Sequence, residues 1–277
     1  MNILFLLIAS ALLHACWNAF LKNKGNSLNK VVILYTFISL ISFPFLFVVK
    51  FPSLTTMGYL FVSVIAHTMY MHSLARAYMK SDFSVAYPFA RGMAPMLTVL
   101  VLIIFLGQSI SFTEIVGIFL IVSAIFFLIE ARVQKINLSN ILSSLYFPIS
   151  ISFYTLVDAF GIRDASSAEQ YIVWLFFLIP IPLLIYVFHN NKINLKTTFV
   201  LEGKSIFVAS LGTLTSYSII LWAFTQAPIH YVASIRESSI IFASLIGLLF
   251  FKEQGLKRRL AAAIILFIGV FLLEYVS

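Results

Sequence analysis

Long apolar runs dominate the chain, and only short polar segments separate them. A helix needs roughly 20 mainly apolar residues to cross a bilayer, and ten stretches come close to that length. They cover residues 2–21, 31–49, 56–78, 83–106, 112–129, 140–161, 169–188, 205–226, 229–250 and 259–275. The pattern predicts an all-α integral membrane protein with ten transmembrane helices and no soluble domain.

The two halves of the chain look like copies of each other. At an offset of 145 residues Arg91 matches Arg236, each about two turns inside its apolar run. Each half has five predicted spans, an odd number, so the copies must cross the membrane in opposite directions. We therefore predict two inverted five-helix repeats, residues 1–135 and 136–277, with a ligand site near the midplane between them.

Composition and charge support a membrane location. Apolar residues make up 61% of the sequence, charged residues 10%, and the mean hydropathy is +1.04. The net charge of +8 is unevenly distributed: thirteen of the 18 Lys and Arg residues fall in loops on one side, two on the other and three inside spans. By the positive-inside rule the rich side faces the cytoplasm. We expect both termini outside the inner (plasma) membrane, lipid as the surrounding partner and no nucleic-acid ligand.

The two matched arginines are the leading candidates for a binding site. A charge in the bilayer interior costs several kcal/mol unless it faces a cavity, a partner or a ligand. Pro88 and Pro95 bracket Arg91, so we expect the fourth span to be bent or locally unwound there. Pro228 is expected to start the ninth span.

Further polar side chains share helix faces inside the spans. His14, Trp17 and Asn18 have i, i+3, i+4 spacing in the first span, and Tyr154 and Asp158 have i, i+4 spacing in the sixth. Equivalent spans thus each present polar side chains on one face. We expect His14, Trp17, Asn18 and Tyr154 to contact substrate.

Two carboxylates could bind a proton or an ammonium group, because acidic residues inside spans are seldom retained for packing alone. These are Asp158, expected near the outer end of its span, and Glu237. Adjacent helical residues point about 100° apart, so Glu237 is not expected to pair with Arg236. Tyr87 and Trp222 complete the expected substrate contacts, with a place in the aromatic lipid belt as the alternative for Trp222.

Several kinds of chemistry lack their sequence patterns. We find no phosphate-binding loop, no dinucleotide fingerprint and no metal-spaced group of His, Cys and carboxylate residues. Cys16 is the only cysteine, which leaves no disulfide framework. We therefore expect no cofactor, no metal site and no catalytic residue, and we do not expect an enzyme.

The chain resembles the drug/metabolite transporter superfamily, specifically its ten-helix EamA type. The resemblance rests on His14-Ala-Cys-Trp17-Asn18 with Lys22, Arg91-Gly-Met-Ala-Pro95, Tyr154-x-x-x-Asp158 and Arg236-Glu237-Ser-Ser. It covers the whole chain. Members of this family often carry Gly-Glu after the fourth helix, where this sequence has Gly107-Gln108.

The resemblance implies a secondary carrier for a small metabolite, amino-acid-like or otherwise anionic or zwitterionic, with proton coupling or exchange. Arg91 and Arg236 would hold the anionic part of the cargo. Family members also move cationic amines and drugs, which is the first alternative. A channel or scaffold and an intramembrane enzyme acting on a lipid are alternatives of other classes, and a homodimer is possible.

Overall fold

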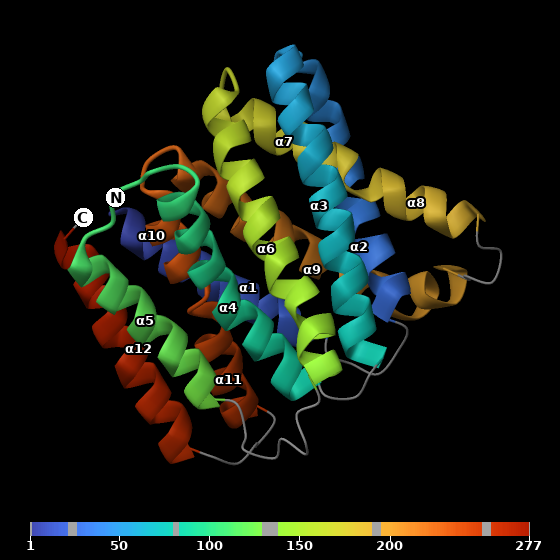
Figure 1. The fold of residues 1–277 in the computed structure, drawn as a ribbon. Coiled ribbons are helices and arrows are strands. Elements are labelled where there is room, and N and C mark those ends of the chain that lie inside the picture. Colours follow the sequence, from blue (N-terminus) through green and yellow to red (C-terminus); the bar gives the residue numbers. More distant parts are fainter. Residues whose placement is uncertain are drawn as a thin grey trace.

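In the part of the chain that the structure describes, every regular element is a helix (Figure 1). The computed structural model describes residues 2–21, 27–79, 83–128, 138–189, 195–250 and 256–276. Within these ranges it leaves out the side chains of 18–21, 27, 72–79, 83–91, 128, 138–145, 188, 247–250, 256 and 274–276. The elements are α1 (Ile3–Leu21), α2 (Ser27–Ser42), the 3₁₀ helix η1 (Phe43–Phe47), α3 (Leu54–Met79), α4 (Phe83–Ile104), α5 (Phe112–Leu128), α6 (Leu138–Asp164), α7 (Ala168–Leu178), α8 (Pro180–His189), α9 (Leu195–Phe224), α10 (Ile229–Arg236), α11 (Ser239–Phe250) and α12 (Leu256–Val276).

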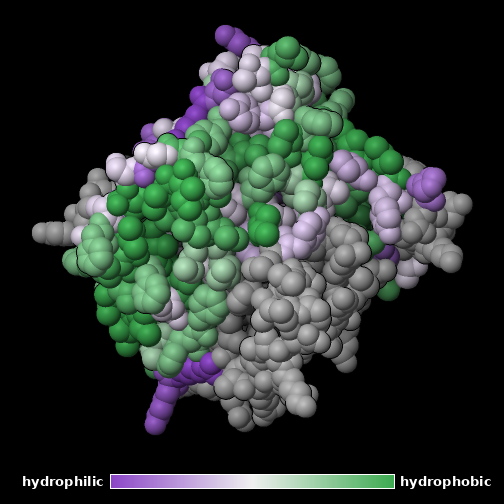
Figure 2. Space-filling view, in the orientation of Figure 1, coloured by the Kyte–Doolittle hydropathy of each residue, from purple (hydrophilic) through white to green (hydrophobic). Residues whose placement is uncertain are grey.

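The length and apolar character of the helices indicate a membrane protein. Judged by length and composition, four helical stretches could cross a membrane: Leu28–Phe47, Leu54–Met71, Ala168–Val187 and Leu195–Phe224. Shorter apolar helical stretches are Ile3–Trp17, Gly92–Ile104 and Phe112–Phe127. Figure 2 shows hydrophobic residues spread over the flank that α5 and α12 occupy in Figure 1, with hydrophilic residues gathered toward the upper and lower ends. The all-helical prediction is confirmed.

Three of the predicted spans are interrupted. The second changes from α2 to the 3₁₀ helix η1 at Pro44, and the seventh is divided into α7 and α8 around Ile179. The ninth begins after Pro228, as predicted, and is divided into α10 and α11 by a turn at Glu237 and Ser238.

The fourth span differs from its prediction. Helix α4 is continuous from Phe83 to Ile104, through both Pro88 and Pro95, so the span is not unwound beside Arg91, and the bend stays a prediction. A proline removes one backbone hydrogen bond and crowds the preceding turn. The remaining bonds of this 22-residue helix keep it continuous.

Helices from the first half of the chain pack mainly against helices from the second. Helix α5 lies along α12, α1 packs on α9 and α11, α3 and α4 pack on α6, and α2 packs on α7 and α9. Hydroxyl groups connect several of these pairs: Ser10 Oγ donates to Ser216 O at 2.7 Å, and Ser39 Oγ donates to Phe177 O at 3.0 Å. In lipid, close packing and such bonds hold helices together, because apolar burial supplies little driving force.

Two glycines bring α5 and α12 into backbone contact. A Cβ atom added at Gly269 would lie 2.7 Å from Gly117 O, and one added at Gly117 would lie 2.9 Å from Gly269 O. Further along the same pair, Ala124 and Ala262 are fully buried in one packed cluster. Small residues therefore set the distance between these two helices.

Replacing Gly269 by alanine is expected to lower the free energy of unfolding by about 1–3 kcal/mol, the usual cost of overpacking. The clash is with backbone, which cannot rotate away. Thermal melting in detergent is a suitable measurement. Gly58→Ala is the matched control, because a Cβ atom there meets nothing within 4 Å. Equal melting temperatures for the two variants would contradict the prediction.

Candidate functional site

The break in the ninth span carries the predicted residues Arg236 and Glu237. Helix α10 has eight residues and ends at Arg236. At the break the backbone bonds connect residues three apart, with Glu237 N donating to Ser234 O and Ser238 N donating to Ile235 O, at 3.2 and 3.0 Å. Discontinuous helices of this kind present polar backbone and side chains inside transporters.

Arg236 and Glu237 form an ion pair, so the prediction that they would not pair was wrong. Arg236 Nε and Nη2 both donate to Glu237 Oε1, at 3.2 and 3.1 Å. The 100° rule applies to a continuous helix, whereas Glu237 caps α10 and begins a turn. Arg236 is 6% exposed and Glu237 is fully buried.

Two residues of α6 also contact the Arg236 guanidinium. Nη2 donates to Thr155 Oγ1 at 3.3 Å, and Cζ lies 5.6 Å from the centre of the Tyr154 ring, a cation–π distance. The guanidinium therefore joins α10 to α6. Sequence reasoning had assigned Arg236 and Tyr154 to one site, and the structure brings them into contact.

A buried cavity of about 60 Å³ lies beside this guanidinium, between helices from both halves of the chain. We call it the central cavity. Its walls include four predicted substrate contacts, His14, Trp17, Tyr154 and Arg236. The other lining residues are Ser10, Ala11, Tyr35, His67, Tyr70, Phe176, Ile179, Thr213, Ser216, Tyr217 and Ile220.

The lining combines hydrogen-bond donors with aromatic rings. The indole Nε1 of Trp17 is buried and makes no hydrogen bond to any residue that the structure describes. The His14 and Trp17 rings meet edge to face, with centroids 4.9 Å apart. Gly212 of α9 lets Trp17 pack closely, since an added Cβ atom would lie 2.9 Å from Trp17 Cβ. The cavity wall thus includes one residue with a guanidinium group, Arg236, and one with an indole ring, Trp17.

Asp158 lies behind the wall of the central cavity. Its side chain is fully buried and accepts hydrogen bonds from three neighbouring helices. The donors are Ser63 and His67 of α3, Tyr171 of α7 and Tyr217 of α9, with His67 Nε2 and Tyr171 Oη at 3.0 Å and Tyr217 Oη at 2.5 Å. We call these five residues the Asp158 cluster. The sequence placed Asp158 near the end of a span, but the side chain points into the protein.

His67 and Tyr217 belong both to the Asp158 cluster and to the cavity wall. The His67 ring stacks on Tyr154, with centroids 4.3 Å apart and planes 23° apart. Tyr154 in turn faces the Arg236 guanidinium. A continuous contact path therefore connects the buried Asp158 carboxylate to the guanidinium at the cavity.

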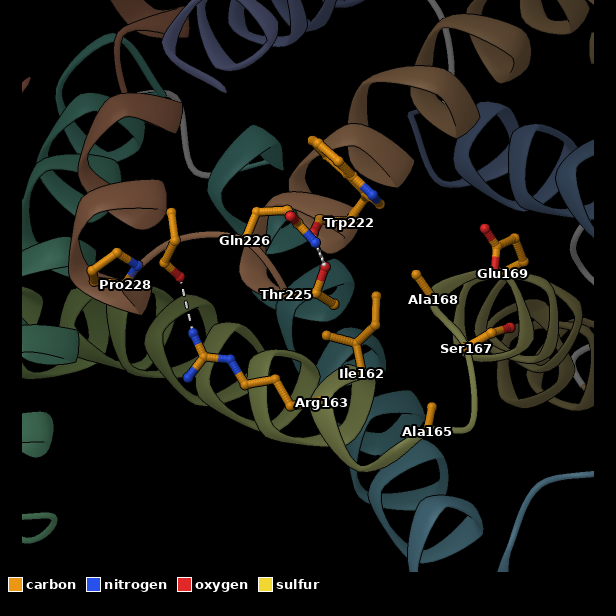
Figure 3. A pocket seen from close by; sticks show the side chains of 11 residues that line it. Ile162, Arg163, Ala165, Ser167, Ala168, Glu169, Trp222, Thr225, Gln226 and Pro228 are labelled. Carbon is orange, nitrogen blue, oxygen red and sulfur yellow. Dashed lines mark hydrogen bonds between the residues drawn. The ribbon is translucent and has the colours of Figure 1, made fainter. Parts of the chain in front are cut away.

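Of the other predicted substrate contacts, only Trp222 has a described side chain. Trp222 lines a second, open pocket of about 640 Å³ where α6 and α9 end and α7 begins, not the central cavity (Figure 3). Arg163 also lines that pocket and donates to Phe224 O and Ala227 O, at 2.7 and 2.9 Å. The side chains of Asn18, Tyr87 and Arg91 lie outside the described part of the structure.

Sequence reasoning missed most of the Asp158 cluster. Ser63 and His67 have the same i, i+4 spacing that drew attention to Tyr154 and Asp158, so this signal was available. Tyr217 shares the predicted eighth span with Trp222, and the sequence leaves it ambiguous between a cavity wall and the aromatic lipid belt. Tyr171 gave no signal, because tyrosines are frequent in membrane spans. Among the described residues, no three His, Cys, Asp or Glu side chains gather as a metal site would require.

Comparisons with known proteins bear on the fold and not on the site. No protein-family model matches the sequence, and no curated protein matches it. The structure matches 25 solved chains. One of them, described as "Crystal structure of protein", has a TM-score of 0.75 and 12% sequence identity, over 99% of this chain and 96% of that chain. A likeness at this identity shows the fold alone.

Proposed function

We propose that this protein is a secondary carrier that moves a small polar metabolite across the inner membrane. The cargo is amino-acid-like or otherwise anionic or zwitterionic. The observation that carries the proposal is the central cavity, which is lined by residues from both halves of the chain, Arg236 among them. A charge that faces a cavity inside a membrane protein marks a substrate or ion pathway by default.

The proposed architecture is ten spans in two inverted repeats, residues 1–135 and 136–277, with both termini outside. Helix contacts support it, because the most extensive contacts between the halves come in corresponding pairs. The packing of α1 on α9 corresponds to α6 on α3, α1 on α11 to α6 on α4, and α2 on α9 to α7 on α3. The offset of 145 also converts the contact of Gly117 with Gly269 into that of Ala262 with Ala124.

The position of the central cavity supports alternating access. It lies between helices of both halves, so movement of one half against the other can open it to either side of the membrane. The breaks at Ile179 and at Glu237–Ser238 are positions where a span can bend without disrupting a continuous helix.

A cationic amine is the second candidate cargo. Four tyrosines, Tyr35, Tyr70, Tyr154 and Tyr217, line the cavity, and aromatic faces attract cations. The carboxylate of Asp158 lies behind the cavity wall and accepts hydrogen bonds from two lining residues, His67 and Tyr217. Removing the guanidinium of Arg236 should then strengthen binding rather than weaken it.

The test begins with a thermal-shift screen of detergent-purified protein against amino acids, organic anions and amines, because a ligand that binds only the folded state raises the melting temperature. A ligand found in this way is then followed as radiolabelled flux into proteoliposomes. We expect Arg91→Ala and Arg236→Ala each to reduce flux of a carboxylate-bearing cargo at least tenfold, since each removes an anion-binding charge.

Lys50→Ala is the matched control, because it removes an exposed cation outside the central cavity. It should leave flux unchanged. Normal flux in both arginine variants would contradict the proposed anion site. Faster flux of an amine in Arg236→Ala would support the second candidate, and flux without saturation or counterflow would indicate a channel.

A further inference from the structure

The Asp158 cluster holds a carboxylate whose acceptor positions are already filled. A carboxylate has about four lone-pair positions, and four side chains, Ser63, His67, Tyr171 and Tyr217, contact its two oxygens. A proton added to the carboxylate would have to displace one of these donors. The arrangement therefore fits an ionised Asp158, and an incoming proton needs a different acceptor.

His67 provides that acceptor. A carboxylate can only accept, so the 3.0 Å contact from His67 Nε2 to Asp158 Oδ2 requires the proton of a neutral imidazole on Nε2. The lone pair is then on Nδ1. His67 also forms part of the cavity wall, whereas Asp158 does not. A proton that enters through the central cavity can reach Nδ1 without any change in the other hydrogen bonds of the cluster.

We infer that the His67–Asp158 pair is the proton-binding site of this protein, with the transported proton on His67 Nδ1. The inference rests on the proposed carrier function and names the group that couples it to a proton gradient. A hydronium ion that reaches the ring gives up one O–H bond and leaves as water, while one N–H bond forms at Nδ1. The resulting imidazolium is stabilised by the buried carboxylate beside it.

Ring and charge contacts around His67 connect this proton to the cargo. Tyr154 of α6 stacks on the imidazole, Tyr217 of α9 meets it edge on at 5.6 Å, and the Arg236 guanidinium of α10 lies over the Tyr154 ring. A proton on His67 adds positive charge near the guanidinium. An anionic group of the cargo and the proton should therefore each favour binding of the other, by linkage.

The test uses the proton alone as the probe, so it stands apart from any transport assay. Full-length protein in detergent is titrated potentiometrically between pH 5 and 8, the range in which histidine charge changes. His67→Gln is expected to take up about one proton fewer than the unmodified protein. The titration step that is lost in His67→Gln belongs to His67. In Asp158→Asn this step should move to lower pH, because the negative charge beside the imidazolium is gone.

His189→Gln is the control, because it removes a histidine at the far end of α8, outside both the cavity and the cluster. His189→Gln should also remove one titrating group. The pH of the His189 step, however, should be the same in Asp158→Asn as in the unmodified protein. Tyr217→Phe provides a second variant that keeps the ring and takes one donor from the carboxylate. The His67 step should then move to higher pH, since the less neutralised carboxylate attracts the imidazolium more strongly.

Equal proton uptake by His67→Gln and the unmodified protein would overturn the inference, as would a His67 step that neither Asp158→Asn nor Tyr217→Phe moves. These outcomes are distinct from failure of the carrier proposal. If His67 titrates as described but the protein shows no flux, the proton site stands and the carrier proposal fails. If flux is normal but the His67 step is absent, the carrier proposal stands and the proton site fails.

Discussion

Replacing Asp158 by leucine is expected to lower the free energy of unfolding by about 3–5 kcal/mol, the range for removing one partner from a buried charged network. The variant leaves the hydroxyls of Ser63, Tyr171 and Tyr217 and one imidazole N–H without their acceptor. A buried donor without an acceptor costs about 1–3 kcal/mol. Part of that cost is recovered where a hydroxyl rotates to a backbone carbonyl.

The measurement is unfolding by SDS in mixed micelles, with the free energy extrapolated to zero SDS. Asp164→Leu is the matched control on the same helix, because Asp164 is exposed and accepts from a single described hydroxyl, Thr56 Oγ1, at 2.7 Å. It should cost about 1 kcal/mol, the value of one hydrogen bond. Equal losses of unfolding free energy in the two variants would show that the Asp158 cluster contributes no more to stability than one exposed hydrogen bond.

Asp158→Asn separates the charge from the shape of the side chain. The amide keeps one oxygen that can accept, but its nitrogen meets donors where an oxygen stood. We expect an intermediate loss of stability. The comparison matters for function too, because it shows whether the other cluster residues hold His67 in place when the carboxylate charge is absent.

The all-helical fold was predictable from the sequence because the length and apolar composition of a segment are local properties. Pro228 at the start of α10 was also readable, since proline suits a helix start. Interruptions were harder. Proline at Pro88 and Pro95 did not break α4, while α10 ends at Arg236 with no proline beside it. Where a helix breaks inside a membrane depends on which neighbouring groups satisfy the freed backbone, and those neighbours are distant in sequence.

The site was predictable only where one helix face carried it. Helical spacing predicted His14, Trp17 and Tyr154, and matching between the halves predicted Arg236. All four residues line the central cavity. The partners of Asp158 come from three other helices, at sequence separations of 95, 91, 13 and 59 residues. No periodicity within one helix contains such pairings. Trp222 illustrates the opposite case, because an aromatic residue alone does not indicate which of two pockets it lines.

Replacing Glu237 by glutamine is expected to destabilise the protein by about 3–5 kcal/mol, because it leaves the buried Arg236 charge without its carboxylate partner. The double variant Arg236→Gln/Glu237→Gln removes both charges and should recover most of that loss. The free energies of the unmodified protein, both single variants and the double variant form a cycle whose coupling term isolates the pair. Additive losses would contradict a stabilising ion pair at the break.

The same four proteins also distinguish packing from cargo binding. If the guanidinium serves only to neutralise Glu237, the double variant should regain ligand binding together with stability. If Arg236 binds the anionic part of the cargo, the double variant should fold like the unmodified protein and still fail to respond in the thermal-shift screen. We expect the second result, because Arg236 forms part of the cavity wall while it pairs with Glu237. The ion pair then holds the guanidinium in the position from which it contacts the cargo.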